Sequence, residues 1–199
     1  MKSKLILLFA FTSLVFFLIA LFLFSLLLNR TDKSESDRVA VVKEMRALSR
    51  LETASFTIEK IIDSESSGNV FQKLLFGDKI LLIANGNVIA GIDFIGIEEK
   101  DVVVEGKKIQ VSLPPPQIFL ASLDNTKTKV YDRKSGLLSG GNDNLESEAR
   151  ATAEQSIREA ACSSGILDMA SDNARKQITS FLSSLGFVEI TITIPQGSC

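Results

Sequence analysis

The chain begins with a long uninterrupted stretch of apolar residues. The stretch extends from Leu5 to Leu28, contains no charged residue, and has as its polar members only Thr12, Ser13 and Ser25. A helix of this length, at about 1.5 Å per residue, reaches about 36 Å, enough to cross the hydrocarbon core of a bilayer with some tilt. The pattern predicts a transmembrane anchor at residues 5–28, surrounded by membrane lipid.

A cleavable signal peptide is the main alternative for this segment. Its apolar core is normally about 7–15 residues long and is followed by small residues at the cleavage site. Here the run is longer and continues directly into Asn29-Arg30 without a small-x-small pair. Lys and Arg are similarly frequent on the two sides of the run, so their count does not decide the orientation. We base the orientation on the short basic tail, in which Lys2 and Lys4 are expected to stay inside. We expect a signal-anchor that is not cleaved, with the C-terminal part exported.

Residues 29–38 are polar and of mixed charge without apolar periodicity, which predicts a juxtamembrane linker. A single domain is then expected over residues 39–199. Its first element is predicted to be a short helix, because four apolar residues recur at helical spacing: Val41, Val42, Met45 and Leu48. Alternating apolar and polar residues at 53–62 predict a half-buried strand after this helix.

The clearest local signal in the domain is Asn85-Gly86. It separates two apolar runs, at residues 80–84 and 88–94, and Asn-Gly between such runs is the strongest short hairpin signature. The first run is apolar without interruption, which favours burial on both faces and a central place in the sheet. We therefore predict a hairpin here.

A second hairpin is predicted around the turn Glu105-Gly106, between strands at 102–104 and 109–113. Pro114-Pro115-Pro116 ends the latter strand, because prolines donate no hydrogen bond to a ladder. Further short strands are expected at 117–123 and 128–131.

The C-terminal third has helical periodicity. Asp143 and Glu146 have the spacing of a capping box for a helix that ends at Ser163-Ser164-Gly165. A second helix follows and ends near Gly186, and alternation at 188–194 predicts a closing strand. The predicted inward residues of the two helices are Leu145, Ala149, Ala153, Ile157 and Ala161, then Leu167, Ala170, Ala174, Ile178, Phe181, Leu182 and Leu185. The expected fold class is α+β: an N-terminal transmembrane helix, a mostly antiparallel sheet, a C-terminal helical hairpin and a closing strand.

Composition excludes several kinds of chemistry. The chain has 22 Lys and Arg against 24 Asp and Glu, without a basic patch, so nucleic acid is not an expected partner. It has no histidine and only two cysteines, which removes the commonest general base and the usual metal ligands. We assign no catalytic residue, no metal site and no cofactor from the sequence.

The two cysteines allow two interpretations. If the domain lies outside the cytoplasm, Cys162 and Cys199 could form one disulfide. Alternatively Cys162 is a small buried side chain in an alanine-rich helix, and Cys199 is a free thiol at a frayed chain end. The second interpretation is the one we favour from sequence.

Two segments are candidate binding sites. In the Tyr131-Asp132-Arg133 segment, Arg133 could bind an anion and Asp132 could act as a base. We favour a structural role instead. In that interpretation Asp132 lies in a turn, Arg133 is its solvated partner, and Tyr131 is an aromatic plug of the sheet. The rigid Pro114-Pro115-Pro116 segment could dock in an aromatic groove of a partner, or simply end a strand.

Ten short motifs resemble, in their order along residues 39–194, a family of single-pass bacterial membrane proteins described only as a domain of unknown function. The resemblance implies a membrane anchor and a bacterial setting, and it assigns no activity or site residue. The motifs are Leu51-Glu52-Thr53, Glu59-Lys60, Gly77-Asp78, Gly91-Ile92-Asp93, Leu113-Pro114-Pro115-Pro116, Tyr131-Asp132-Arg133, Gly136-Leu137, Gly165-Ile166-Leu167, Asn173-Ala174-Arg175 and Gly186-Phe187.

These observations favour a non-enzymatic domain, anchored in the bacterial cell membrane, that binds another envelope protein or associates with itself. The alternative is an envelope enzyme, hydrolase-like, built on carboxylates such as Asp93 and Asp132 together with Arg133. The two hypotheses differ in geometry, because an enzyme requires these side chains to converge on one concave pocket.

Overall fold

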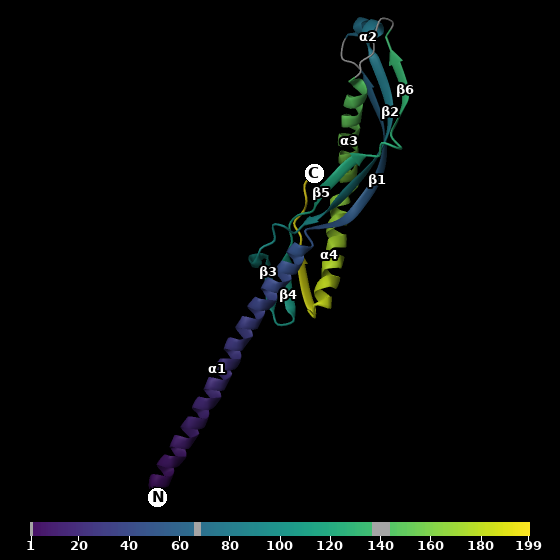
Figure 1. Cartoon of the computed structure of the whole chain (residues 1–199). Helices are drawn as coiled ribbons and strands as arrows, with labels where there is room; N and C mark the ends of the chain where they lie inside the picture. Colours follow the sequence, from purple (N-terminus) through teal and green to yellow (C-terminus); the bar gives the residue numbers. More distant parts are fainter. Residues whose placement is uncertain (1, 66–68, 137–143) are drawn as a thin grey trace.

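The structure is an elongated α+β fold of two β-sheets and several helices, in which the long N-terminal helix α1 and the short helix α2 lie at opposite ends (Figure 1). The computed structural model describes residues 2–65, 69–136 and 144–199, and within its helices it does not describe the side chains of residues 2–12, 26–36, 73–74 and 76. The elements are α1 (Lys2–Ala47), β1 (Arg50–Glu65), α2 (Val70–Phe76), β2 (Asp78–Asp93), η1 (Glu99–Asp101), β3 (Val102–Glu105), β4 (Lys108–Ser112), β5 (Gln117–Leu123), β6 (Lys129–Ser135), α3 (Leu145–Ser163), α4 (Ile166–Ser184) and β7 (Glu189–Thr193).

Helix α1 continues without a break into the domain. The backbone of residues 29–38, predicted as a linker, is helical. The last turns of α1 bury Val41, Val42 and Met45, as their spacing predicted, whereas Leu48 lies past the helix end and is exposed. Over the described part of the chain, no helix has the length and apolarity that a membrane span requires.

The larger sheet is antiparallel and centred on β2. Strand β1 pairs with β2 from Arg50 opposite Asp93 to Glu65 opposite Lys79. On the other side of β2, β5 pairs with residues 86–91 and β6 with residues 78–83. Alternate residues of β2 are buried beneath α3 and α4. Leu81 and Ile83, which point to the other face, are half-buried, so the central position predicted for this run is confirmed but full burial on both faces is not.

The hairpin predicted at Asn85-Gly86 does not form, because β2 is a single strand that passes straight through this dipeptide. Glycine is required here by close packing: a Cβ atom at position 86 would lie 2.7 Å from the Ser122 carbonyl oxygen and 2.9 Å from the Ile157 side chain. Thr128 lies in the loop between β5 and β6, and its hydroxyl is 3.1 Å from both the backbone N and the backbone O of Asn85. The prediction was wrong because an Asn-Gly pair does not always mark a turn: here the glycine allows close packing within a strand.

The loop between β5 and β6 is organised by Asp124. Its Oδ1 accepts hydrogen bonds from the Thr126 hydroxyl (2.6 Å), the Thr126 backbone N (2.9 Å) and the Lys127 backbone N (3.3 Å). These bonds favour the carboxylate, with the Thr126 hydroxyl contributing most, and lower the pKa of Asp124 to about 2. The Asp124 backbone N also donates to the Asn85 carbonyl at 2.7 Å, so the loop keeps β5 and β6 on one line beside β2.

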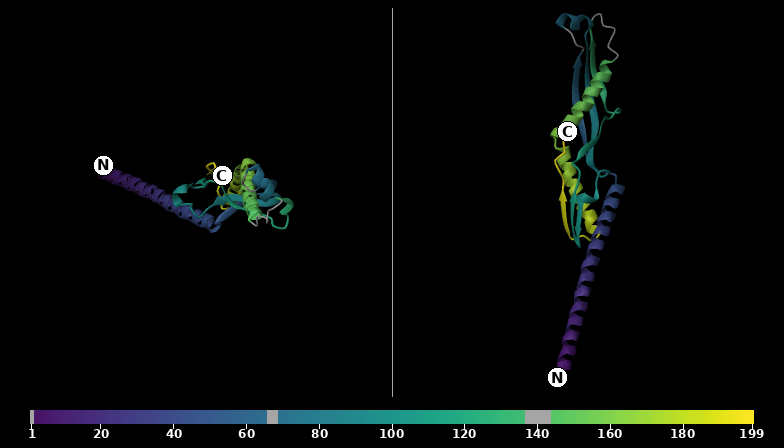
Figure 2. Two further views of the ribbon diagram at one scale, coloured as in Figure 1. Left: turned by 90° about the horizontal axis from the view of Figure 1, so that it is seen from above. Right: turned by 90° about the vertical axis from the view of Figure 1, so that its left-hand side faces the viewer.

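Helices α3 and α4 cover one face of the larger sheet. They follow one another along the strands instead of folding back side by side, so the predicted helical hairpin is wrong (Figures 1 and 2). The predicted inward stripe of α3 is confirmed throughout, and that of α4 is confirmed except that Phe181 is half-buried and Leu185 exposed. Asn144 precedes α3, and Asp143, the predicted capping residue, lies outside the described residues.

The second hairpin and the closing strand are confirmed, but they form a separate sheet. Strands β3 and β4 are antiparallel, with Glu105 opposite Lys108, and β7 joins β4 in parallel. The expectation of one mostly antiparallel sheet was therefore too simple.

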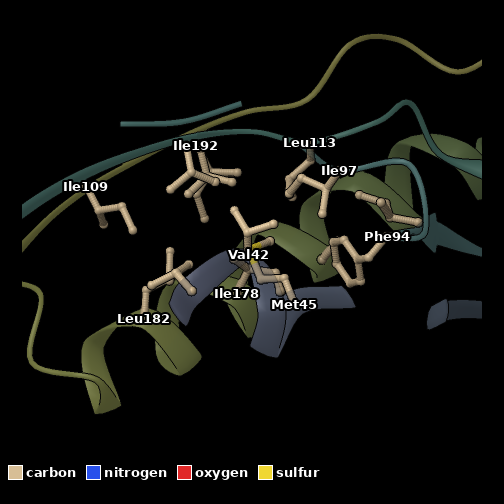
Figure 3. Close-up of a cluster of buried hydrophobic side chains, with 14 of the residues drawn as sticks. Val42, Met45, Phe94, Ile97, Ile109, Leu113, Ile178, Leu182 and Ile192 are labelled. Carbon is tan, nitrogen blue, oxygen red and sulfur yellow. The ribbon is translucent and has the colours of Figure 1, made fainter. Parts of the chain in front are cut away.

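Two hydrophobic clusters stabilise the two sheets. One lies between the larger sheet, α3 and the first turns of α4. The other brings α1, the smaller sheet and the rest of α4 together. Figure 3 shows residues of α1 (Val42 and Met45) and α4 (Ile178 and Leu182) gathered beneath Ile192 of the smaller sheet. Helix α4 contributes to both clusters and so joins them.

We expect Gly86→Ala to destabilise the protein by about 1–3 kcal/mol, since the added methyl group must displace the Ser122 carbonyl or the Ile157 side chain. Urea denaturation followed by circular dichroism measures this loss. Gly96→Ala is the matched control, because no atom lies within 4 Å of its added Cβ. Equal stability of the two variants would contradict the packing at Gly86.

Candidate functional site

The Tyr131-Asp132-Arg133 segment lies inside β6, at the end of the larger sheet far from α1. Asp132 is therefore not in a turn, contrary to the prediction. The register of β6 on β2 shifts between Leu81 and Leu82, so Tyr131 has no counterpart on β2. Its side chain is 70% exposed. The interpretation of Tyr131 as an aromatic plug of the sheet was therefore wrong.

Arg133 is bound to a buried carboxylate that sequence reasoning missed. Its Nη2 lies 2.6 Å and its Nε 3.2 Å from Oδ2 of Asp78, whose side chain is 1% exposed. The Ser135 hydroxyl lies 3.3 Å from Oδ1 of the same carboxylate. A buried carboxylate needs such a charged, hydrogen-bonded partner, so Arg133 is structural but not, as predicted, the solvated partner of Asp132.

The side chains proposed for the alternative enzyme do not share a site. Asp93 ends β2 beside Arg50 (3.6 Å), and its Oδ1 accepts a hydrogen bond from the backbone N of Ile95. Asp132 lies opposite Leu81 of β2, twelve residues from Asp93, which at about 3.3 Å per residue is about 40 Å. The two carboxylates are therefore at opposite ends of the sheet.

The three prolines connect the two sheets. After β4, the Leu113 backbone N donates to the Thr193 carbonyl, and the chain then crosses to β5. Pro115 is exposed, whereas Pro116 is buried against the C-terminal tail at Gly197, where any side chain would collide with Pro116. This arrangement agrees with the predicted role of the prolines in ending a strand. Of the three prolines, Pro115 is the exposed one.

A disulfide joins Cys162, at the end of α3, to Cys199, with Cα atoms 6.1 Å apart. The favoured interpretation of two unpaired cysteines was wrong. After β7 the tail returns to the junction of α3 and α4, and Gly197 lets it approach Pro116 and Leu167 closely enough for the bond. The sequence signals for it were the even number of cysteines and the expected export of the domain.

A cavity of about 390 Å³ lies where α1, the β3–β4 turn and the end of α4 meet. Two carboxylates and several apolar residues line it, and no sequence pattern pointed to it. The lining residues are Asp37, Ala40, Val41, Glu44, Gly106, Leu185, Gly186 and Phe187. Within the described ranges, no group of three or more potential ligands could hold a metal ion.

Residues 43–192 match the sequence profile of a family described as proteins of unknown function, DUF4230. The match spans most of the domain predicted from sequence, and it confirms the expected domain of unknown function. No curated protein and no solved structure matches the chain.

Arg133→Ala should destabilise the protein by about 2–3 kcal/mol, because it leaves the buried Asp78 carboxylate without its cation. The loss should be smaller than for a fully buried pair, since the Arg133 side chain is 36% exposed. Lys134→Ala on the same strand is the control and should change stability by about 0.5 kcal/mol or less. Denaturant titration of both variants measures the difference, and equal effects would argue against a structural ion pair.

Cys199→Ser should lower stability by about 3–4 kcal/mol, the value that loop-closure entropy gives for a sequence separation of 37 residues. The same denaturation measurement on the reduced natural protein should give the same loss. If the variant were as stable as the oxidised protein, the disulfide would not constrain the unfolded chain.

Proposed function

The chain belongs to the DUF4230 family of proteins of unknown function, and we propose that it is a single-pass membrane protein of the bacterial envelope that binds or scaffolds other envelope components. The first support is the run from Leu5 to Leu28, which lies within α1. The described side chains of this part, residues 13–25, are all exposed, including Phe16 at 77%. A continuous exposed apolar surface of this kind is typical of contact with lipid or with another protein.

The disulfide between Cys162 and Cys199 is the observation that carries the proposed location outside the cytoplasm. Disulfides persist in the oxidising environments of the periplasm and cell surface and are rare in the cytosol. The location agrees with the signal-anchor orientation, in which Lys2 and Lys4 stay inside.

The elongated shape supports a binding or scaffold role. Strand β1 has 16 residues and at about 3.3 Å per residue extends about 50 Å from the end of α1 toward α2 (Figure 1). At the far end, Val70 and Phe71 of α2 are exposed. A domain of this form presents long surfaces to neighbours at a distance from its anchor.

Two single-cysteine additions to the natural chain test the topology. Lys176→Cys on the exposed side of α4 should react with a membrane-impermeant maleimide in spheroplasts, whereas Ser3→Cys should react only after lysis. Mass spectrometry of the labelled peptides separates the new thiols from the Cys162–Cys199 disulfide. The reverse pattern would overturn the proposed orientation, and recovery of the chain in the soluble fraction would overturn the anchor.

A further inference from the structure

The two edges of the larger sheet run in the same direction. Strand β1 leaves the end of α1 and runs toward α2, and β2 returns antiparallel to it. Strands β5 and β6 are both antiparallel to β2, so they run parallel to β1. Over the described residues the sheet ends at β1 on one side and at the β5–β6 line on the other.

This direction decides how copies of the chain could extend the sheet. If β1 of one copy lies beside the β5–β6 line of another, both copies have the same orientation and both α1 helices are at the same end. Antiparallel pairing of two β1 strands would instead place the α1 helices at opposite ends. Of these two arrangements, only the first suits chains anchored in one membrane, so this step rests on the proposed function.

The two edges also differ in charge. Strand β1 carries four acidic and two basic residues, whereas β6 carries three basic residues and one acidic residue. Several of these charges are already paired within the chain: Arg133 with Asp78, Lys134 with Asp132, and Asp63 with Lys79. The charges that matter for a neighbouring copy are therefore Glu59 on β1 and Lys129 on β6. Opposite charges on two edges favour contact between them and disfavour contact of either edge with itself.

The register of the larger sheet shows which residues of its two edges are at the same level along the strands. On β2, Ile83 is opposite Ile61 of β1 and also opposite Lys129 of β6, so Ile61 and Lys129 are level on the same face of the sheet. In an unshifted neighbouring copy, Lys129 would lie beside Ile61 and diagonal to Glu59, two residues earlier on β1. The Lys129 stem could then cover Ile61, which is 68% exposed, while its ammonium group approaches the Glu59 carboxylate.

From these observations we propose that copies of the chain associate side by side along the membrane, with β1 of one copy against the β5–β6 line of the next. The contact is heterologous, so it produces a row or a ring of more than two copies. The bulge between Glu52 and Ala54 and the loop at Asp124 limit the continuous pairing to short stretches. The partner is thus a second copy of this chain, held by edge hydrogen bonds and complementary charge.

Paired cysteines in the full chain, oxidised in native membranes, test the arrangement. Ile61→Cys combined with Lys129→Cys should give a ladder of dimers, trimers and larger species on non-reducing gels. The two positions cannot bridge within one chain, because β2 lies between them and holds their Cα atoms about 9–10 Å apart. Each single variant should stay monomeric, as should Ile61→Cys combined with Lys176→Cys on α4.

Two results would overturn the proposal: no ladder from the double variant, or dimers from Ile61→Cys alone, which indicate pairing of two β1 strands. The outcome is independent of the labelling test above. Labelling of Lys176→Cys without a ladder rejects only the association, and a ladder with reversed labelling rejects only the location.

A charge exchange provides a second readout at another level of the sheet. Thr57 of β1 and Ser122 of β5 both lie opposite Asn87, so Thr57→Cys with Ser122→Cys should also crosslink between copies. Adding Lys129→Glu should reduce this crosslinking about tenfold, and adding Glu59→Lys as well should restore it. Lys176→Glu is the charge-matched control and should have no effect; an equal loss from it would contradict the specific contact.

Discussion

The burial of β2 is the constraint on which the rest of the structure depends. Ile80, Leu82, Ala84 and Val88 on one of its faces are inaccessible to solvent, and α3 and α4 supply the apolar surface that covers them. The same strand provides the hydrogen-bonding partners of β1, β5 and β6. Every other element of the larger sheet is therefore positioned by its contact with one strand.

The division into two hydrophobic clusters gives α4 and the disulfide complementary roles. Helix α4 passes from one cluster to the other, with Ala170 in the first and Ile178 in the second. The disulfide adds a covalent link between the end of α3 and the tail that follows β7. Because the second cluster also contains the end of α1, the larger sheet, the smaller sheet and α1 are held in one packed body.

Local periodicity predicted the elements, and long-range packing determined their arrangement. The stripe on α3 and the turn at Glu105-Gly106 depend on neighbouring residues and were predicted correctly. Asn85-Gly86 was misassigned because the need for glycine comes from β5 and α3, which are distant in sequence. The Asp78–Arg133 pair joins residues 55 positions apart, and nothing in either segment alone specifies the other. For the same reason the cavity beside α1 and the Cys162–Cys199 pairing could not be deduced from spacing.

The continuity of α1 has a mechanical consequence. A domain on a flexible tether would sample most orientations above a bilayer, but here the helix continues from the apolar run to Val41 and Met45, which are part of a hydrophobic cluster. The helical stretch from Leu28 to Val41 is about 20 Å long, and the gentle curvature usual for helices changes its direction by only about 10–20° over that length. In a membrane, the tilt of the apolar segment would set the angle of the whole domain, and a torque applied at the far end of β1 would be transmitted back to the bilayer.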